Sequence, residues 1–332
     1  MTTPMRILAV AAFAAILHAG GVIAQTRPLP VWIDTDPAVG VADRDVDDGL
    51  ALLQAFHSPE IVVRGVSVVF GNAPLAQAWP IGLRIVGRFG PPGVRAYRGA
   101  ANASQLGVET AATRALAASL RREPLVVLAL GPATNVGTVL KNHPELRDRI
   151  VRLVAVAGRR PGQRFTTGAT NPNGHRDFNF EEDPEAFRVL LASGVPLTLA
   201  PFEISSKVWL KSPDLDAIAA DGAAAGWIVA PARRWLGLWT RTFGVDGFNP
   251  FDTLAIARAT SPSQLTCETL PARVDVLRDD ATEARMQGTT VARKPYLLVS
   301  RDFGRSAPHV EYCYDVSGSF KADLLRRLKS RR

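Results

Sequence analysis

The sequence contains few of the features that mark specialised protein classes. Its two cysteines, Cys267 and Cys313, do not have the spacing of a zinc site. Two cysteines in an exported protein can form a disulfide, and two buried free thiols are the alternative. No internal repeat, low-complexity tract or long Gly/Ser linker divides the chain. We therefore expect an ordinary globular protein with a single large domain.

The features of a nucleic-acid-binding protein are also missing, although the chain is basic. Its formal net charge is +8, from 39 basic and 31 acidic side chains. The basic residues are scattered apart from the C-terminal run "RRLKSRR", aromatic residues do not interleave with them, and no nucleic-acid-binding motif occurs. This pattern favours a solvated surface and no nucleic-acid partner. An exported protein that binds nucleic acid in a salt-dependent manner is the alternative.

The N-terminal segment is too short to be a membrane-spanning helix. Arg6 precedes the apolar run "ILAVAAFAAILHAGG", which falls short of the roughly 20 residues needed to cross a bilayer. Val22 and Ala24 stand at the −3 and −1 positions of a cleavage site after Ala24. This pattern predicts a signal peptide over residues 1–24, with an uncleaved anchor as the alternative. We expect residues 25–332 to be exported, periplasmic or secreted, with no membrane partner after cleavage.

Hydrophobic patterns in the rest of the chain alternate between strands and helices. Apolar strands are predicted at residues 29–36, 61–72, 150–158 and 195–203, and another begins at residue 124 and ends in a Gly-Pro turn. Helices are predicted at residues 46–56 and 183–194, and from Asn135 onward. Strands that are apolar throughout are typical of parallel sheets covered on both faces. We predict an α/β fold with a Rossmann-like, open, mostly parallel sheet and helices on both faces.

Polar residues follow several of these strands at the point where each one ends. They are Asp34 and Asp36, Asn72, and Thr134 with Asn135. In parallel sheets, ligands bind beyond the carboxyl ends of the strands, so we expect these side chains to converge there. The alternative is that each is a turn former or a helix cap, since Asn and Asp are common at such positions.

The stretch "DTDPAVGVADRDVDD" concentrates negative charge after the first strand. It contains six carboxylates within fifteen residues and no Lys. Carboxylates this close together resist ionisation unless a positive charge lies among them. The stretch therefore predicts a positive charge among the carboxylates, for which a divalent metal is a candidate, and an acidic turn that caps a helix is the alternative.

Five motifs, in order along residues 31–260, resemble those of the inosine-uridine preferring nucleoside hydrolases. The family's D-x-D-P-G-x-D-D signature is present as "DTDP" and "VDD", separated by the insertion "AVGVADRD". The other four matches are "VSVVFGN", "LGPATNVG", "DFNFEEDPEA" and "NPFDTLA". The resemblance implies the nucleoside hydrolase fold, a nucleoside substrate, a Ca²⁺ ion in the pocket and a homo-oligomer, either dimer or tetramer. Oxygen ligands without His or Cys suit Ca²⁺.

The resemblance also implies roles for individual residues. The Ca²⁺ ligands would be Asp36, Asp48, the backbone carbonyl of Thr134 and Asp252. Asp36 would also act as the general base toward water, with Asp34 orienting the cluster. The sugar would be bound by Asp47, Asn72, Asn171, Asp177 and Asn179, with Asn171 and Asp177 on its 5′ side. Cleavage of the N-glycosidic bond would pass through a ribosyl cation, as in other glycoside hydrolysis.

Two departures from the family pattern concern the sugar and the leaving base. Asp177 stands where the family has Glu, and Phe251 stands where the family has the His that protonates the base. Trp235 and Trp239 lie four residues apart on one face of a predicted helix, so we expect them, with Phe251, to stack a purine between the indoles. The alternative places both Trp in the core. His175 could serve as the acid, or it is a solvated loop histidine.

Two other functions are consistent with the same residues. The loss of the family His suggests an exported nucleoside-binding protein with little or no turnover. Hydrolysis of a related N- or C-riboside is a milder alternative. The binding protein would bind nucleoside and release no base, whereas the second alternative is an enzyme that acts on a substrate other than a common nucleoside.

Overall fold

The computed structural model describes residues 27–168, 174–221, 223–280, 286–287, 290–304 and 306–330. The predicted signal peptide and Asn171 lie outside the described residues. Within the described part, no helix is both long and apolar enough to cross a membrane.

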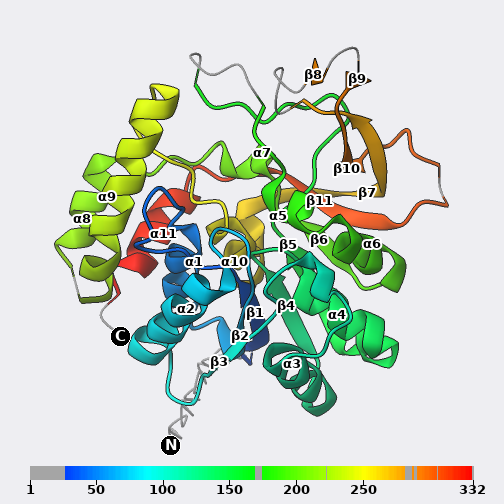
Figure 1. The fold of residues 1–332 in the computed structure, drawn as a ribbon. Helices are drawn as coiled ribbons and strands as arrows, with labels where there is room; N and C mark the ends of the chain where they lie inside the picture. Colours follow the sequence, from blue (N-terminus) through cyan, green and yellow to red (C-terminus); the bar gives the residue numbers. More distant parts are fainter. Residues whose placement is uncertain are drawn as a thin grey trace, which may run out of the picture.

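The centre of the fold is a nine-stranded sheet in the order β10-β7-β11-β6-β5-β4-β1-β2-β3 (Figure 1). The parallel part contains β1 (Leu29–Thr35), β2 (Ile61–Val68), β3 (Ala96–Arg98), β4 (Leu125–Ala129), β5 (Ile150–Ala155) and β6 (Leu197–Leu199). Strand β11 (His309–Val316) pairs parallel with β6, and it pairs antiparallel with β7 (Leu265–Arg278). Strand β10 (Arg293–Val299) pairs antiparallel with β7. A separate pair is formed by β8 (Met286–Gln287) and β9 (Thr290–Val291).

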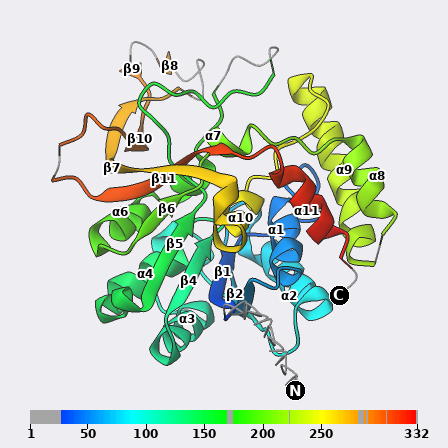
Figure 2. The same ribbon diagram turned by 180° about the vertical axis from the view of Figure 1, so that it is seen from behind.

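Helices cover both faces of this sheet (Figures 1 and 2). One face packs against α1 (Asp47–Phe56), α2 (Leu75–Phe89), α8 (Ser212–Ala219), α9 (Ala223–Phe243), α10 (Thr253–Thr260) and α11 (Phe320–Leu328). The other packs against α3 (Ala111–Arg122), α4 (Thr134–Asn142) and α6 (Pro184–Ser193). The short helices are α5 (Phe178–Glu182), α7 (Phe202–Ser205) and the 3-10 turns η1 (Ala103–Gln105), η2 (Pro144–Arg149) and η3 (Pro262–Gln264).

Strand β1 shows why an apolar strand becomes the middle of such a sheet. Val31 and Ile33 belong to the core on one face, and Trp32 belongs to the core on the other. Successive strand residues point to opposite faces, so a strand that is buried on both sides must be apolar throughout. The predicted α/β class with a mostly parallel, doubly covered sheet is confirmed.

Helix α6 follows the signals in its sequence. Asp183 is its N-cap, with a carboxylate that accepts from the backbone N–H of Ala186 (3.0 Å), and Pro184 occupies the first turn. Gly194 ends the helix in the left-handed conformation, with φ of 76°.

The antiparallel strands β7, β10 and β11 and the short edge strand β3 are the parts of the sheet that we did not predict. The two cysteines lie opposite each other on β7 and β11, and a disulfide joins Cys267 to Cys313 across 46 residues of sequence. Of the two alternatives for the cysteines, the structure therefore has the disulfide.

Candidate active site

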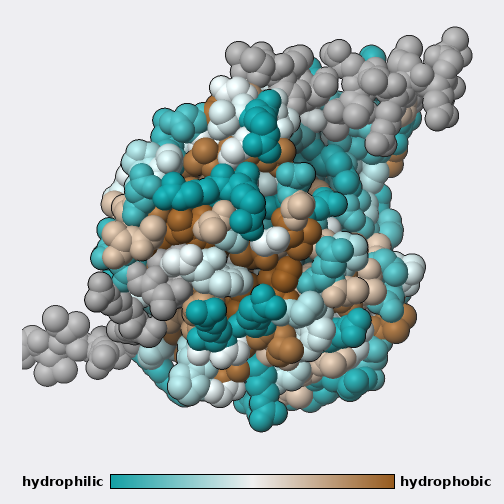
Figure 3. Space-filling model, turned by 60° about the vertical axis from the view of Figure 1, so that its left-hand side comes forward, coloured by the Kyte–Doolittle hydropathy of each residue, from teal (hydrophilic) through white to brown (hydrophobic). Residues whose placement is uncertain are grey.

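A cavity of about 820 Å³ opens at the carboxyl ends of the parallel strands. The residues that follow β2, β4 and β5, namely Asn72, Leu130, Val156 and Ala157, contribute to its wall. One end is lined by carboxylates and the other by aromatic rings. Figure 3 shows hydrophobic side chains gathered between hydrophilic ones on one face of the molecule. We name the two parts of the cavity the acidic end and the aromatic end.

At the acidic end, Asp34 is held at the end of β1, away from solvent. The Ser67 hydroxyl, opposite Asp34 in the strand register, donates to its Oδ1 (2.5 Å), and the Asn135 amide donates to the same atom (2.8 Å). Trp32 Nε1 in turn donates to the Ser67 hydroxyl (2.9 Å). Asp34 is not among the cavity-lining residues, and neither are Asp36 and Asp48.

Asp36 is fixed between two close backbone segments. The Asn72 N–H donates to its Oδ2 (2.6 Å), and its own N–H donates to Asp48 Oδ1 (3.0 Å). A Cβ atom on Gly71 would overlap Asp36 Oδ2, and one on Gly131 would lie 2.6 Å from Oδ1. Only glycine at both positions lets the loops approach the carboxylate this closely.

Three further carboxylates meet beside Asp36. One oxygen from each of Asp47, Asp48 and Asp252 lies within 4.8 Å of the others. Asp48 lies in the first turn of α1, accepts from the Thr35 hydroxyl, and receives a longer bond from the Asn72 amide (3.3 Å). The carboxyl ends of β1 and β2 and the start of α1 therefore converge as expected.

Burial raises the pKa of each carboxyl in this cluster, and repulsion between carboxylates adds to the shift for Asp34, Asp36, Asp47 and Asp252. Burial raises the pKa of Asp34 to about 7. It raises the pKa values of Asp36, Asp47 and Asp252 well above their usual range, and repulsion from neighbouring carboxylates adds to each shift. Asp48 is raised by burial, and the hydrogen bond from Thr35 opposes that shift in its pKa. The charged forms therefore need a compensating cation.

The orphaned oxygens of the cluster fit a hard divalent cation. Asp36 Oδ1 and Asp252 Oδ2 are buried, and neither has a hydrogen-bond partner among the described residues. Buried carboxylate oxygens that lack donors are costly unless a charge pairs with them. An all-oxygen donor set suits Ca²⁺ or Mg²⁺ rather than Zn²⁺. Thr134 lies at the start of α4, and its hydroxyl donates to Asp183 Oδ2 (2.5 Å).

The sequence missed one carboxylate of the acidic end. Asp45, from the insertion, lines the cavity and accepts from the N–H groups of Val46 (2.6 Å) and Asp47 (3.1 Å). Burial raises the pKa of Asp45 to about 7. The signal was present, because Asp45 belongs to the quoted acidic stretch, but no motif of the family covers the insertion.

Of the predicted sugar-binding residues, the four that the structure describes line the cavity: Asp47, Asn72, Asp177 and Asn179. Asp177 is buried and accepts from the Gly158 N–H (2.8 Å), and burial raises its pKa to about 6. The Asn179 amide donates to the carbonyls of Leu130 (2.5 Å) and Val156 (3.1 Å). Both amide donors of Asn179 are used, so its oxygen is left to accept from a ligand.

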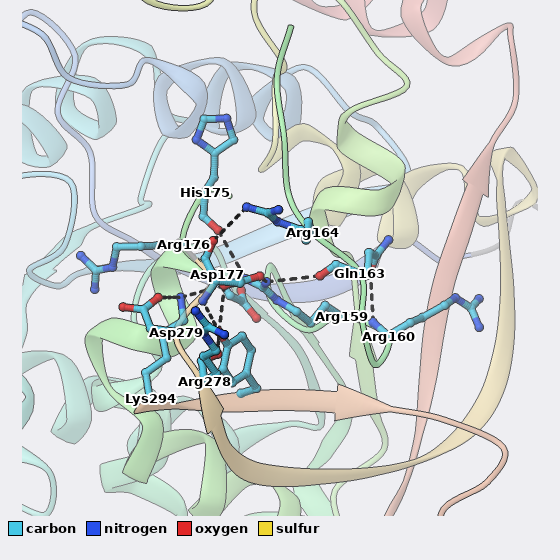
Figure 4. A network of polar contacts seen from close by, with 12 residues as sticks. Arg159, Arg160, Gln163, Arg164, His175, Arg176, Asp177, Arg278, Asp279 and Lys294 are labelled. Atoms are coloured by element: carbon cyan, nitrogen blue, oxygen red, sulfur yellow. Dashed lines mark hydrogen bonds and ion pairs between the residues drawn. The ribbon is translucent and has the colours of Figure 1, made fainter. Parts of the chain in front are cut away.

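A polar network that the sequence did not predict supports Asp177 from behind (Figure 4). The Arg159 side chain, 1% exposed, pairs with Asp280 (2.8 Å) and lies over the Phe165 ring at 3.9 Å. Lys294 pairs with Glu181 (2.8 Å) and Asp279 (3.3 Å). These residues come from the segment after β5, from α5, from just beyond the end of β7 and from β10. The Arg159–Asp280 and Lys294–Glu181 ion pairs join positions more than 100 residues apart, so no local pattern connects them.

The aromatic end is a closed circuit of rings. Three neighbouring pairs have ring centroids 6.1 Å apart: His175–Phe202, Phe202–Phe251 and Phe251–Trp239. Phe243 completes the ring of contacts, with its centroid 5.3 Å from that of Trp239 and 5.0 Å from that of His175. Phe165 stacks on Phe202 at 4.8 Å. Sequence reasoning had named Trp239 and Phe251 for this wall and had missed Phe165, Phe202 and Phe243.

The expected slot between the two indoles is absent. Trp235 and Trp239 pack edge-to-face, with centroids 6.2 Å apart and planes at 64°. Residues four apart on a helix are direct neighbours, so their side chains contact each other instead of separating around a base. Both indoles line the cavity, so a base can lie against them but not between them.

Comparison with known proteins agrees with this geometry. The sequence profile of the family described as "Inosine-uridine preferring nucleoside hydrolase" matches residues 31–319. The pyrimidine-specific ribonucleoside hydrolase RihA of Salmonella enteritidis is 27% identical over 232 residues, 61% of this chain and 69% of the relative.

Two solved structures have the same fold. The plant nucleoside hydrolase PpNRh1 superposes with a TM-score of 0.74 at 20% identity, covering 92% of this chain and 100% of the other. The purine-preferring ribonucleoside hydrolase of Gardnerella vaginalis gives a TM-score of 0.72 at 21% identity, covering 90% and 98%. With its motifs, cavity and family profile in agreement over almost the whole described chain, this protein belongs to the inosine-uridine preferring nucleoside hydrolase family.

Proposed function

We propose that this enzyme hydrolyses the N-glycosidic bond of ribonucleosides in a calcium-dependent reaction and prefers purine nucleosides. The observation that carries the proposal is the cluster of Asp47, Asp48 and Asp252, whose carboxylate oxygens lie within 4.8 Å of one another at one end of the cavity. The aromatic end of the same cavity offers the base a surface to stack on.

The residues proposed to hold Ca²⁺ are Asp36, Asp48 and Asp252, with the backbone carbonyl of Thr134. When bound, the ion would supply Lewis acidity and the positive charge that keeps these buried carboxyls ionised. The fit rests on the orphaned oxygens of Asp36 and Asp252 and on the absence of nitrogen and sulfur donors from this cluster.

The chain's own residues divide the chemistry between them. Asp36 takes a proton from the attacking water through Oδ1, because its Oδ2 is held by the Asn72 N–H. Asp47 and Asn179 accept from ribose hydroxyls, and Asp177 lies on the 5′ side of the sugar. Water adds to C1′ as the bond to the base breaks, and positive charge develops on the ribosyl ring. Contacts that strengthen with that charge raise the rate and not only the affinity.

The proposed purine preference rests on the aromatic end. A two-ring base covers more of a wall of Trp and Phe side chains than a one-ring base, and aromatic contacts add about 0.5–1.5 kcal/mol each beyond burial. The relatives do not decide the point, since the Salmonella enzyme is named pyrimidine-specific and the Gardnerella enzyme purine-preferring. The preference is therefore a property to be measured on this cavity.

Export and assembly are further parts of the proposal. The N-terminal pattern of residues 1–24 supports cleavage after Ala24, and the Cys267–Cys313 disulfide is typical of an oxidising compartment. N-terminal sequencing of the protein recovered from periplasm or medium tests cleavage and location together. We also propose a homo-oligomer, dimer or tetramer, which light scattering of the purified mature chain tests.

The activity is tested by incubating residues 25–332 with a panel of purine and pyrimidine nucleosides and measuring ribose release, with calcium and with a chelator. We expect calcium-dependent release that is faster for purine nucleosides. Release that persists in the chelator would contradict the role of the cation.

Absence of release from every nucleoside would favour a different function. Phe251 offers no proton to a leaving base, which is the observation that favours a nucleoside-binding protein. In that case ribosides would still raise the unfolding temperature of the calcium-bound protein while releasing no base.

A further inference from the structure

His175 is the cavity residue that the proposed reaction leaves unused. It lines the aromatic end, where the other rings are Phe and Trp, and it is the one imidazole among the described residues of the cavity wall. Its Nε2 is buried, with no hydrogen-bond partner among the described residues. A buried polar atom without a partner is uncommon in folded proteins and often marks a functional group.

The structure fixes this imidazole on both sides of its ring. Phe243 meets it edge-on with centroids 5.0 Å apart and planes at 89°, and Phe202 lies 6.1 Å away. The backbone is held as well, because the His175 N–H donates to the Phe165 carbonyl (2.5 Å) and the His175 carbonyl accepts from Arg159 (3.5 Å). Figure 4 shows the ring directed away from the network of Arg159, Asp177 and Lys294. His175 is therefore positioned by packing, and it forms no ion pair with the residues that the structure describes.

A second unpartnered atom lies on the same wall. Trp235 Nε1 is also buried, lines the cavity, and has no hydrogen-bond partner among the described residues. An indole N–H can donate a hydrogen bond but does not release its proton, whereas an imidazolium can transfer one. The aromatic end thus holds two buried polar atoms that have no partner in the part of the chain that the structure describes, and one of the two can carry a proton to a ligand.

We propose that His175 is the catalytic acid that protonates the leaving base, and that Trp235 donates a hydrogen bond to the same base. This proposal rests on the proposed nucleoside hydrolysis. As the bond between C1′ and the base nitrogen breaks, its electron pair moves into the base. The proton on His175 Nε2 is transferred to a ring nitrogen or carbonyl oxygen of the base, which leaves as a neutral molecule. The proton of the attacking water goes to Asp36, and exchange with solvent restores both side chains.

The two ends of the cavity make this division of roles reasonable. In the proposed reaction the carboxyls of the acidic end serve the water and the sugar. Asp36 accepts from the Asn72 N–H, and Asp47 accepts from the Asp48 N–H. At the aromatic end, Phe251 stands where the sequence resemblance places a histidine, and a phenyl ring has no proton to give. Burial lowers the pKa of His175, which makes the imidazolium a stronger acid toward the departing base and reduces the fraction of the enzyme that carries it at neutral pH.

The test compares leaving groups in the mature protein with calcium present. Nucleosides need a proton on the departing base, whereas 4-nitrophenyl β-D-ribofuranoside releases a stabilised phenolate without one. For His175→Phe we expect kcat with inosine and adenosine to fall about 100-fold or more, the usual contribution of a general acid. We expect kcat with the nitrophenyl riboside to stay within about 3-fold of wild type, since the acid contributes nothing to that reaction.

Two further variants separate proton transfer from shape. His175→Gln keeps a hydrogen-bond donor without a transferable proton, so it should be as impaired with nucleosides as His175→Phe. His309→Phe, on the exposed part of β11 outside the cavity, is the matched control and should behave as wild type.

Equal losses with both substrate types would assign His175 a structural role and overturn the proposal, and so would wild-type rates for His175→Phe or His175→Gln with nucleosides. Wild-type turnover of the nucleosides reports on the proposed function itself. The ratio of the variant's kcat to the wild-type kcat reports on His175. A failure of the proposed nucleoside hydrolysis is therefore distinguishable from a failure of the role proposed for His175.

Discussion

The acidic and aromatic ends of the cavity are built in opposite ways. Most of the acidic end comes from one short segment of the sequence, the end of β1 and the start of α1, which contribute Asp34, Asp36, Asp47 and Asp48. Of the residues named for this cluster, only Asp252 comes from a distant segment. The aromatic end is assembled from Phe165, His175, Phe202, the face of α9 and Phe251, each on a different segment.

The difference extends to how each end is held. Backbone N–H groups and hydroxyls fix the carboxylates with bonds of defined length, such as Asn72 to Asp36 (2.6 Å) and Asn135 to Asp34 (2.8 Å). The rings are held by packing contacts with one another. Replacing one apolar side chain by another of similar size costs such contacts little, whereas a buried polar group that loses its hydrogen-bond partner is strongly destabilised. We expect the acidic end to determine whether catalysis occurs and the aromatic end to determine which base is accepted.

Asp36→Asn is the change expected to have the largest effect. The amide has nearly the same shape but cannot take a proton, so kcat for nucleosides should fall by about 1,000-fold, within the range of lost general-base catalysis. Ribose release measures the loss, and calcium titration shows whether the ion still binds. Asp148→Asn, whose side chain is 82% exposed, is the control and should keep wild-type kcat. An Asp36→Asn enzyme that retained a tenth of the activity would contradict the division between the two ends.

Removing calcium should destabilise the protein in a pH-dependent way. In the ion-free state, burial holds the pKa of Asp34 and of Asp45 at about 7, above the value of 3.8 for an ordinary Asp. The folded form then binds more protons than the unfolded form, so the free energy of unfolding falls as pH rises from about 4 through about 7. Calcium favours the ionised carboxylates and should reverse this loss.

The measurement is thermal unfolding with calcium and with a chelator, at about pH 5 and about pH 7.5. At calcium 100-fold above its Kd, we expect about 2.7 kcal/mol of stabilisation at the higher pH, which corresponds to a shift of about 5 °C. The shift should be smaller at the lower pH, where protons compete with the ion. A calcium effect that grew on acidification would argue against a carboxylate site.

The same contrast explains how much could be predicted from the sequence. The parallel strands, helix α6 and the acidic cluster have local signals: continuous apolar runs, an Asp-Pro start with a Gly end, and carboxylates at strand ends. Strand β7 has no such signal, because its fourteen residues follow no regular alternation between buried and exposed positions. The antiparallel strands are therefore seen only in the structure, as is the Cys267–Cys313 pairing between them.

At the aromatic end, the sequence predicted the participants only in part and their arrangement wrongly. Spacing on α9 placed Trp235 and Trp239 on one face, but it did not indicate that the indoles would pack on each other. Phe202 and Phe243 meet His175 through tertiary contacts between separate segments, and no local pattern encodes such contacts. Asp45 was missed for another reason, since it lies in an insertion that the family motif does not describe.

Changing the aromatic end should affect substrate choice more than chemistry. Trp235→Ala removes one ring and its unpartnered N–H, so kcat/KM for purine nucleosides should fall about 10-fold, the equivalent of roughly 1–1.5 kcal/mol of stacking and hydrogen bonding. Trp235→Phe keeps a ring without the N–H and should lie between that variant and wild type. The nitrophenyl riboside, which has a smaller aromatic leaving group, should lose less. Initial rates over a range of substrate concentrations measure each value.

The matched control for this last change lies on the same helix. Trp227 packs against Phe89 (5.5 Å) and does not line the cavity, so Trp227→Ala should keep kcat/KM for every substrate within about 2-fold of wild type, even where lost packing lowers stability. The calcium-dependent shift in unfolding temperature should be the same in Trp235→Ala as in wild type, because the indole touches no residue of the acidic cluster in the described contacts. If Trp235→Ala also abolished that shift, the two ends would be coupled through the protein. The base site and the cation site would then have to be treated as one unit.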